Sequence, residues 1–432
     1  MGGKIGIIAD DLTGANDSGV QLAKKGFSST VVFNLEGIQE ADSIPDVLVV
    51  DTDSRAVSGE EAHEAVIKAA SLLFQQGYSH VYKKIDSTLR GNVAAEISAA
   101  ANIYKPDAVV VVPAFPKVNR TTVDGLHYVN GTLITETEFG RDPKTPVAEG
   151  FIPALLKKSV EEDITLINLD LIRGSKKTLA SFVENVMAAG KSWFVCDSET
   201  EEDLKSIAAF FAKLDKKIVW AGSGGLIEYL PAELEVFPQA GQDLKKKSVD
   251  QTLIVSGSLS QVTKKQLESL KGLKGIEFIE INPVQLVEDT LVADGLAVSK
   301  NASHYVIYVD SSEANRVAAR EAGKRKGYSS NQVSEAIANG LAKAAKAFLN
   351  QVQDIGGLVL TGGDTAKAVC GELNVNEMEL HSEVEAGLPF GRIKSGEKNF
   401  WAITKAGGFG NEDSLVKAVE YMTGKVGQYE TN

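Results

Sequence analysis

Short apolar runs with no helical period recur along the first half of the chain and predict buried β-strands. They lie at residues 5–9, 30–33, 46–50, 80–84, 108–112, 164–168, 193–196 and 218–220. Segments with helical patterns stand between them, for example at residues 16–25, 59–76 and 93–101. Strands that are apolar throughout and alternate with helices indicate a mainly parallel sheet with both faces covered.

The same alternation returns in the second part of the chain. We expect strands at residues 253–255, 305–309, 357–360 and 400–404, and helices at 333–352 and 414–422. Between the two parts, residues 237–251 contain Pro, Gly, Gln and three consecutive lysines and show no apolar period, which is typical of a linker. The sequence therefore predicts an α/β protein of two domains, residues 1–236 and 252–432, each built on a mainly parallel sheet flanked by helices.

Charged side chains follow the expected strands of the first domain, at the edge where parallel sheets bind ligands. Carboxylates accept hydrogen bonds from sugar hydroxyls, and arginine forks match a substrate carboxylate. The candidate substrate-binding residues are Asp10, Asp11, Arg55, Lys84, Asp86, Ser87 and Arg90. Any one of the charged residues is as readily a surface ion pair, and Asp10 or Asp11 can simply cap the next helix. Their coincidence at three strand ends favours a site for a hydroxylated acid.

The expected strands of the second domain end in small residues instead. The candidates are Ser256, Gly257, Ser258, Gly362, Gly363, Asp364, Thr365, Gly407 and Gly408. Glycines let backbone amides approach anionic oxygens, and helix N-termini add a favourable dipole. A single turn of this kind can be no more than a tight strand-to-helix connection. Three of them in one domain favour a site for the phosphates of a nucleotide.

Composition narrows the classes of function. A length of 432 residues suits two domains, and the net charge of −13 argues against nucleic acid or an anionic membrane as a partner. The two cysteines form no metal or disulfide pattern. The sequence has no P-loop, GxGxxG, HExxH or GxSxG motif, which weakens the hydrolase, metalloprotease and dehydrogenase interpretations. Neither a signal-peptide core nor an apolar run of about 18–20 residues is present, so we expect a cytoplasmic protein.

Six short motifs together resemble the four-carbon acid sugar kinases. They are residues 8–17, 84–92, 256–258, 361–365, 387–391 and 405–410, in order along nearly the whole chain. The resemblance implies an enzyme that uses ATP to phosphorylate D-threonate, D-erythronate or a 3-oxo-tetronate at O4. It also implies that the acid sugar binds the N-terminal domain and the nucleotide the C-terminal one. Residues 16–26 look closer to the threonate branch, which favours D-threonate, converted to 4-phospho-D-threonate in sugar-acid catabolism.

Phosphoryl transfer mainly requires positioning and neutralisation of charge. We expect an active site in the interdomain cleft, closed by motion about the linker, with Mg²⁺ bridging the phosphates. Arg55 and Arg90 would anchor the acid, and Asp11, Asp86 or Asp364 would orient or deprotonate the attacking hydroxyl. Metal ligands and oligomeric state stay open, and a homodimer is allowed. The alternatives are a non-catalytic two-lobed sugar-acid sensor, which needs no nucleotide turns, and a dehydrogenase of the same substrates.

Overall fold

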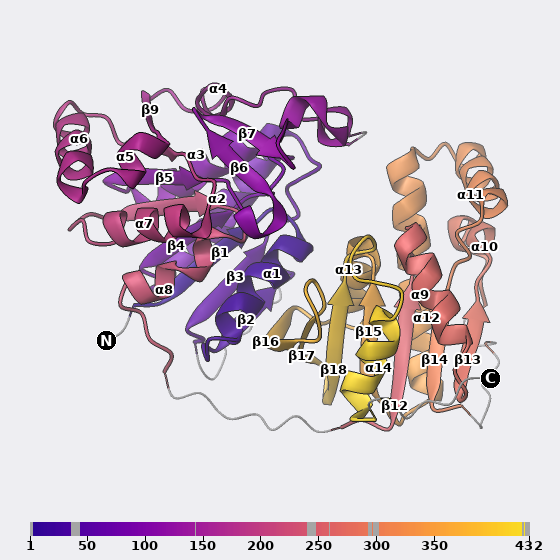
Figure 1. The fold of residues 1–432 in the computed structure, drawn as a ribbon. Helices are drawn as coiled ribbons and strands as arrows, with labels where there is room; N and C mark the ends of the chain where they lie inside the picture. The colour runs from indigo at the N-terminus through magenta and orange to yellow at the C-terminus, as the bar shows by residue number, and fades with distance from the viewer. Residues whose placement is uncertain are drawn as a thin grey trace. The chain divides into compact units, whose positions relative to one another are not determined.

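The computed structural model describes residues 3–35, 44–142, 144–239, 248–258, 260–292 and 302–425, together with Leu296 and Gly427 (Figure 1). The chain divides into two compact units, Met1–Gly241 and Gln242–Asn432, which are treated one at a time below. Within the described ranges, every helix is too short or too polar to span a bilayer.

The first unit is built on a sheet of parallel strands in the order β2-β3-β1-β4-β11-β5-β10-β9. These strands are β1 (Ile5–Ala9), β2 (Ser29–Val32), β3 (Val47–Asp51), β4 (His80–Lys84), β5 (Ala108–Val112), β9 (Ile164–Ile167), β10 (Trp193–Cys196) and β11 (Ile218–Gly222). Every residue of β1, β3, β5 and β11 is buried. The parallel sheet that the apolar runs predicted is therefore confirmed.

Helices cover both faces of this sheet. They are α1 (Leu12–Ala23), α2 (Gly59–Gln75), α3 (Val93–Tyr104), α4 (Ile152–Leu156), α5 (Leu169–Arg173), α6 (Lys176–Ala188), α7 (Glu201–Phe211) and α8 (Leu230–Glu233). Helices α2 and α3 share one core with Ile8, Val81 and Val219 of the sheet. On the opposite face, the ring of Phe211 in α7 meets that of Trp220 edge to face, with 6.3 Å between the ring centroids.

A small antiparallel sheet in the same unit was not predicted. It consists of β6 (Arg120–Val123), β7 (Leu126–Val129) and β8 (Thr132–Leu133). Its two hairpins turn at Asp124-Gly125 and Asn130-Gly131, all four with positive φ. Such Asp-Gly and Asn-Gly pairs are the usual residues of two-residue hairpin turns, because both positions need a left-handed backbone. Short 3₁₀ helices follow, among them η3 (Ile134–Glu136) and η4 (Glu138–Arg141).

The second unit contains strands in the order β13-β14-β12-β15-β18-β17-β16. The first five of these are parallel, whereas β17 runs antiparallel to both β18 and β16. The strands are β12 (Gln251–Ser256), β13 (Ile276–Glu280), β14 (His304–Tyr308), β15 (Ile355–Thr361), β16 (Glu377–Glu383), β17 (Pro389–Ser395) and β18 (Lys398–Lys405). This sheet is mainly parallel, as expected.

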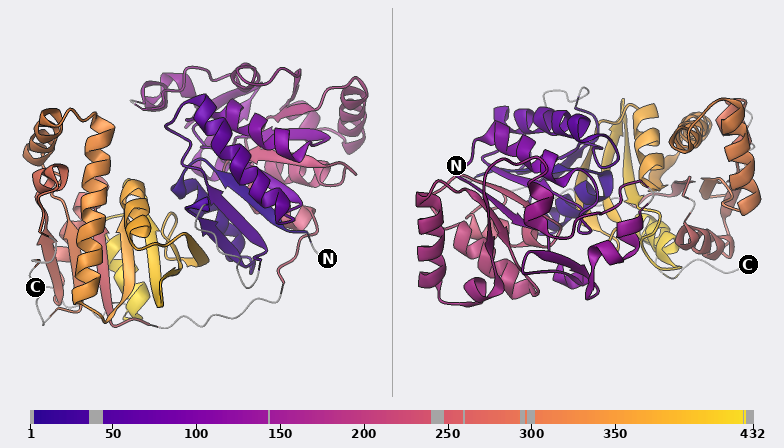
Figure 2. Two further views of the ribbon diagram at one scale, coloured as in Figure 1. Left: turned by 180° about the vertical axis from the view of Figure 1, so that it is seen from behind. Right: turned by 90° about the horizontal axis from the view of Figure 1, so that it is seen from above.

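The described part of the second unit contains six helices. They are α9 (Gln261–Lys271), α10 (Pro283–Glu288), α11 (Glu313–Arg325), α12 (Ser330–Gln351), α13 (Gly363–Glu372) and α14 (Ser414–Thr423). Seen from behind in Figure 2, α12 runs in orange along the strands of this unit. A core of apolar residues, including Ile254, Val359 and Ile403, joins the sheet to α9 and α14.

The expected strands agree with the observed ones to within two residues at either end. The first helix differs more, because it begins at Leu12 rather than at residue 16. Asp11 caps it, with Oδ1 accepting a hydrogen bond from the amide of Gly14 at 2.8 Å. Of the expected linker, residues 240–247 lie outside the described residues, and Gln251 is already the first residue of β12.

Candidate active site

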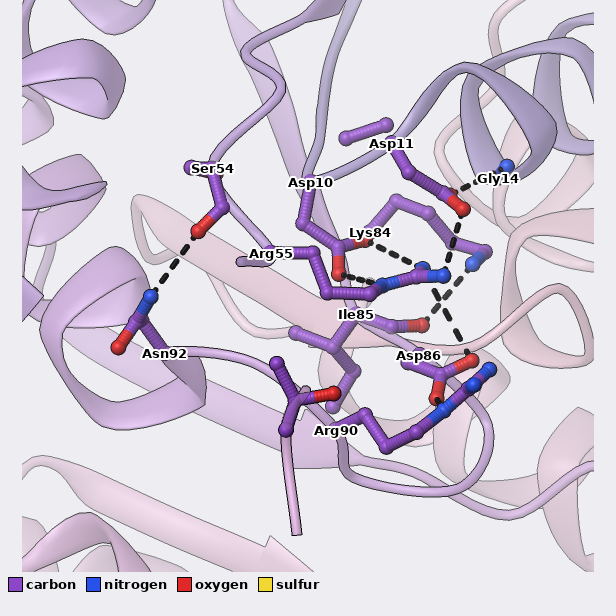
Figure 3. Close-up of polar contacts among 12 residues, drawn as sticks. Asp10, Asp11, Gly14, Ser54, Arg55, Lys84, Ile85, Asp86, Arg90 and Asn92 are labelled. Atoms are coloured by element: carbon purple, nitrogen blue, oxygen red, sulfur yellow. Dashed lines mark hydrogen bonds and ion pairs between the residues drawn. The ribbon is translucent and has the colours of Figure 1, made fainter. Parts of the chain in front are cut away.

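The charged residues predicted in the first unit converge at one edge of its sheet (Figure 3). Strands β3, β1 and β4 are neighbours, and all three are parallel. Asp10 follows β1, Arg55 follows β3, and Asp86 follows β4. Because the carboxyl ends of parallel strands share an edge, three segments far apart in the sequence deliver their side chains to one place.

Arg55 stands at the centre of this cluster. Its Nε and Nη2 donate to the two carboxylate oxygens of Asp10 at 2.7 and 3.1 Å, and its Nη1 reaches Asp11 at 2.5 Å. Its Nη2 also lies 3.8 Å from Asp86. Burial alone would lower the pKa of Arg55, but the surrounding carboxylates outweigh burial and raise it. The guanidinium is thus permanently charged and fixed in orientation.

The carboxylates respond differently to the same neighbourhood. Burial opposes ionisation of Asp10, yet Arg55 overcomes it and lowers the pKa of Asp10. For Asp11, burial together with repulsion from Asp10 raises the pKa, although Arg55 pulls it down. Burial likewise opposes ionisation of Asp86, but Arg55 and Arg90 hold its pKa well below the usual range. Asp11 is therefore the carboxyl group of this cluster most disposed to take up a proton.

Arg90 forms the outer part of the cluster. Its Nε donates to Asp86 at 2.7 Å, and its Nη1 lies 3.5 Å from a carboxylate oxygen of Asp142. Its guanidinium also stands 5.4 Å from the centre of the Phe139 ring. The side chains of Arg55 and Arg90 keep 19% and 27% of their surface exposed. A ligand carboxylate would therefore share these arginines with the protein's own carboxylates.

The two lysines of β4 point to opposite sides, as expected for adjacent strand residues. Lys84 donates to the carbonyl oxygen of Ile85 at 2.9 Å and adds positive charge near Asp10 and Asp11. Lys83 faces away from the cluster and forms a fully buried ion pair with Glu96 at 2.9 Å. Lys84 therefore reaches the charged edge, whereas Lys83 acts on Asp10 only through its charge.

Ser87 is held through its backbone. Its carbonyl oxygen lies 2.9 Å from Nε2 of His127, whose Nδ1 lies 3.1 Å from the hydroxyl of Thr122. Burial lowers the pKa of His127 to about 4, so the ring is neutral near pH 7 and donates to Ser87 from Nε2. His127 thus has a structural role at the site.

A layer of polar residues lies behind the site, and the sequence patterns did not indicate it. The hydroxyl of Ser54 donates to Glu96 at 2.6 Å, and Asn92 donates to the carbonyl oxygen of Ser54 at 2.9 Å. The hydroxyl of Thr52, in the same loop, donates to the carbonyl oxygen of Ala9 at 2.8 Å. These bonds fix the loop that carries Arg55 against β1 and the start of α3.

The three glycine-containing turns of the second unit also meet at one edge. Strands β12, β15 and β18 are neighbours in the sheet, and each turn follows the carboxyl end of one of them. A Cβ atom on Gly407 would overlap the Ser258 hydroxyl, and one on Gly257 would overlap the hydroxyl of Thr365. The turns are therefore in direct contact, and they can be so only because the residues are glycines.

Two other glycines of these turns face open space. A Cβ atom on Gly363 or Gly408 would meet no protein atom within 4 Å. Gly363 opens α13, and Gly362 before it has φ of +100°. Helix α13 thus presents free amides at its N-terminus beside the other two turns, which suits an anionic group. Asp364 is exposed in the first turn of α13.

The candidate catalytic carboxylates are divided between the units, with Asp11 and Asp86 in the first and Asp364 in the second. Among the described residues, no three His, Cys, Asp or Glu side chains are grouped so that they could hold a metal ion.

Comparison with known proteins assigns the two units to known domains. Residues 5–230 match the model of a sugar-binding N-terminal domain, and residues 253–415 match that of a nucleotide-binding C-terminal domain. A D-threonate kinase of Salmonella typhimurium is 34% identical over 429 residues, which covers 97% of this chain and 98% of the relative. This chain belongs to the four-carbon acid sugar kinase family.

Other relatives of this sugar-acid kinase have different names. A D-erythronate kinase of Heliobacterium modesticaldum is 32% identical, with 97% of each chain covered. A 3-oxo-tetronate kinase of Haemophilus influenzae is 29% identical, with 95% of this chain and 97% of the relative covered. A solved Haemophilus influenzae structure shares the fold, with a TM-score of 0.75 at 24% identity over 97% of this chain and all of the other. The family resemblance and the α/β fold expected from the sequence are confirmed.

Proposed function

We propose that this kinase transfers the γ-phosphoryl group of ATP to O4 of D-threonate, giving 4-phospho-D-threonate, in cytoplasmic sugar-acid catabolism. The observation that carries the proposal is the pairing of a charged cluster in the sugar-binding unit with three touching glycine turns in the nucleotide-binding unit. The D-threonate kinase that is 34% identical over nearly the full length supports this choice of substrate.

In this proposal the exposed parts of Arg55, Lys84 and Arg90 neutralise the carboxylate of the acid. Asp10 and Asp86 hold those arginines in place and accept hydrogen bonds from substrate hydroxyls. Asp11 accepts the proton of the attacking hydroxyl, because its raised pKa gives it more proton affinity than the other carboxylates of the cluster. The reacting oxygen and phosphorus must come to about 3–3.5 Å from each other, so the bound acid and the bound nucleotide have to meet in one site during turnover.

The nucleotide phosphates are proposed to bind at the turns around Ser258, Gly363 and Gly408. Mg²⁺ would be held mainly by the phosphates and water. Mg²⁺ would supply neutralisation of the charge on the phosphates. The protein's part is to offer backbone amides and hydroxyls at fixed positions.

A coupled assay of ADP release with D-threonate, D-erythronate and 3-oxo-tetronates tests the substrate, and NMR of the product locates the phosphate. We expect the largest kcat/KM with D-threonate and a phosphate on O4. Turnover of D-erythronate or a 3-oxo-tetronate at a higher kcat/KM would reassign the substrate, and no turnover with any of them would refute the kinase activity.

Gly363→Ala should leave the fold intact and weaken nucleotide binding. The added methyl group meets no protein atom within 4 Å, but it enters the space in which a phosphate would approach the amides of α13. We expect the KM for ATP to rise about tenfold or more, equivalent to about 1.4 kcal/mol. Gly371→Ala is the matched control, since Gly371 lies in the same helix and also faces open space. Equal KM values for the two variants would contradict the phosphate site.

Arg90→Ala should weaken binding of the sugar acid by roughly 2–5 kcal/mol, because a partly buried charge pair with the substrate carboxylate would be lost. Nucleotide binding should stay unchanged, since the proposed nucleotide residues all belong to the other unit. Calorimetric titration with each ligand separately measures both. Arg173→Ala is the control, because Arg173 pairs with Glu199 and Asp203 outside the cluster. Equal losses of both ligands would mean that Arg90 supports the fold instead.

A further inference from the structure

Lys405, the last residue of β18, is almost completely buried beneath the third glycine turn. Its Nζ donates to the carbonyl oxygens of Ala406, Gly407 and Phe409 at 3.0, 3.3 and 3.1 Å. It also lies 3.4 Å from the hydroxyl of Thr263. In the described part of the chain no carboxylate comes within ion-pair distance of it. The ammonium group is thus satisfied almost entirely by the carbonyls of one turn.

These bonds decide where the amides of the turn point. In a planar trans peptide, the carbonyl of one residue and the N–H of the next point in opposite directions. When the carbonyls of Ala406 and Gly407 turn toward Lys405, the N–H groups of Gly407 and Gly408 must turn away from it. Gly408 borders open space, because a Cβ atom on it would meet no protein atom within 4 Å. Such outward amides form a concave site for anions.

The same lysine is linked to a second turn. The hydroxyl of Thr263, a fully buried residue of α9, lies 2.8 Å from the carbonyl oxygen of Gly407 and 3.1 Å from the hydroxyl of Ser258. Gln266 of α9 donates to the carbonyl oxygen of Phe409 at 3.1 Å. Lys405 is therefore the charged centre of a network that holds two of the three turns against each other.

We propose that Lys405 is a positioning residue for the nucleotide phosphates, which holds the carbonyls of residues 406–409 inward so that the amides of Gly407 and Gly408 face the phosphates. Its charge beneath the turn adds attraction for the same anion. This inference rests on the proposed function, because it takes the glycine turns to be the site of ATP. It assigns a role to a residue that touches the turn and not the nucleotide.

The charge on Lys405 depends on few neighbours. Burial lowers the pKa of Lys405 to about 8, and attraction to Glu385 opposes this only in part. Glu385, in the segment between β16 and β17, is itself bound by Lys417 of α14 at 3.2 Å and by the hydroxyl of Ser414. From α9 the groups nearest to Lys405 are the uncharged Thr263 and Gln266. The ammonium group is therefore lost as the pH rises through about 8.

The test is calorimetric titration of the full-length enzyme with ADP and Mg²⁺ at several pH values from 7.5 to 9.5. For the wild type we expect the dissociation constant to rise about tenfold over this range, because the ammonium group deprotonates there. Lys405→Arg keeps its charge, so its affinity, whatever its value, should not change with pH. Lys405→Met should bind ADP at least about tenfold more weakly at pH 7.5. Binding of D-threonate to the first unit should be unchanged in both variants.

Lys265→Met is the control, because Lys265 lies on the exposed side of α9 and pairs with Glu412. Wild-type affinity in a folded Lys405→Met variant would overturn the inference. If that variant does not fold, the pH profiles of the wild type and Lys405→Arg decide, and identical profiles would overturn it. A wild-type enzyme that binds no ADP would instead refute the proposed function, which separates the two failures.

Discussion

Glu96→Ala is expected to lower the free energy of unfolding by about 3–5 kcal/mol, because it leaves the buried ammonium group of Lys83 without its counter-charge. The side chains of Lys83 and Glu96 are 0% and 2% exposed and 2.9 Å apart. Carbonyl oxygens of Ile8 and Lys84 also accept from Lys83, but they carry no full charge. Chemical denaturation at pH 7 measures the loss.

A double-mutant cycle distinguishes the pair from simple loss of packing. Lys83→Met and Glu96→Gln together remove both charges. The loss of unfolding free energy in the double variant should therefore be smaller than the sum of the two single losses by at least about 1 kcal/mol. Asp163→Ala is the control, because its pair with Lys191 is largely exposed and should be worth less than about 1 kcal/mol. If Glu96→Ala lowers the free energy of unfolding by less than about 1 kcal/mol, water reaches the pair of Lys83 and Glu96.

Asp11→Asn is expected to lower kcat by about 10²–10⁴, the usual range for loss of a general base. The amide oxygen of asparagine can still accept from Gly14 and cap α1, so the fold should be retained. Its NH2 group replaces the oxygen that accepts from Arg55, so that bond is lost as well, while Arg55 keeps its two bonds to Asp10. Steady-state kinetics with saturating ATP and sugar acid measure the effect.

The pH profile of the wild type adds a second readout for Asp11. Burial and repulsion from Asp10 raise its pKa, so kcat/KM should fall as the pH decreases through a value above the ordinary aspartate pKa of about 3.9. That acid limb should vanish in the residual activity of Asp11→Asn. Asp53→Asn is the control, since Asp53 is exposed after β3 and has a φ that asparagine tolerates. A loss of less than threefold in kcat for Asp11→Asn would mean that another carboxylate takes the proton.

The charged cluster could be predicted because it depends on a rule of topology. Asp10, Arg55 and Asp86 each follow a strand that its apolar residues reveal, and parallel strands end at one edge. Glu96 and Asn92 could not be predicted in the same way, because their roles depend on how α3 packs beneath a loop some forty residues earlier. The partners of Arg55 and Arg90 were missed for the same reason, since an ion pair leaves no periodic signal.

Strands with one polar face were the part of the fold that the pattern did not reveal. Strand β13 reads Ile-Glu-Phe-Ile-Glu, and β16 carries three glutamates and a histidine. Neither forms the continuous apolar run by which the buried strands were recognised. The small sheet β6–β8 could have been predicted from Asp124-Gly125 and Asn130-Gly131, because such pairs are strong hairpin signals between short strands.

The order of strands in the first sheet has a consequence for synthesis of the chain. Strand β11 lies between β4 and β5, although it follows both in the sequence by more than a hundred residues. At roughly 5–20 residues per second, a ribosome needs on the order of 5–20 s to pass from β5 to β11. During that interval β4 (His-Val-Tyr-Lys-Lys) and β5 (Ala-Val-Val-Val-Val) lack the strand that lies between them, and unpaired strand edges invite aggregation. Nascent chains that end before residue 218 should therefore depend on chaperones far more than chains that extend past residue 222.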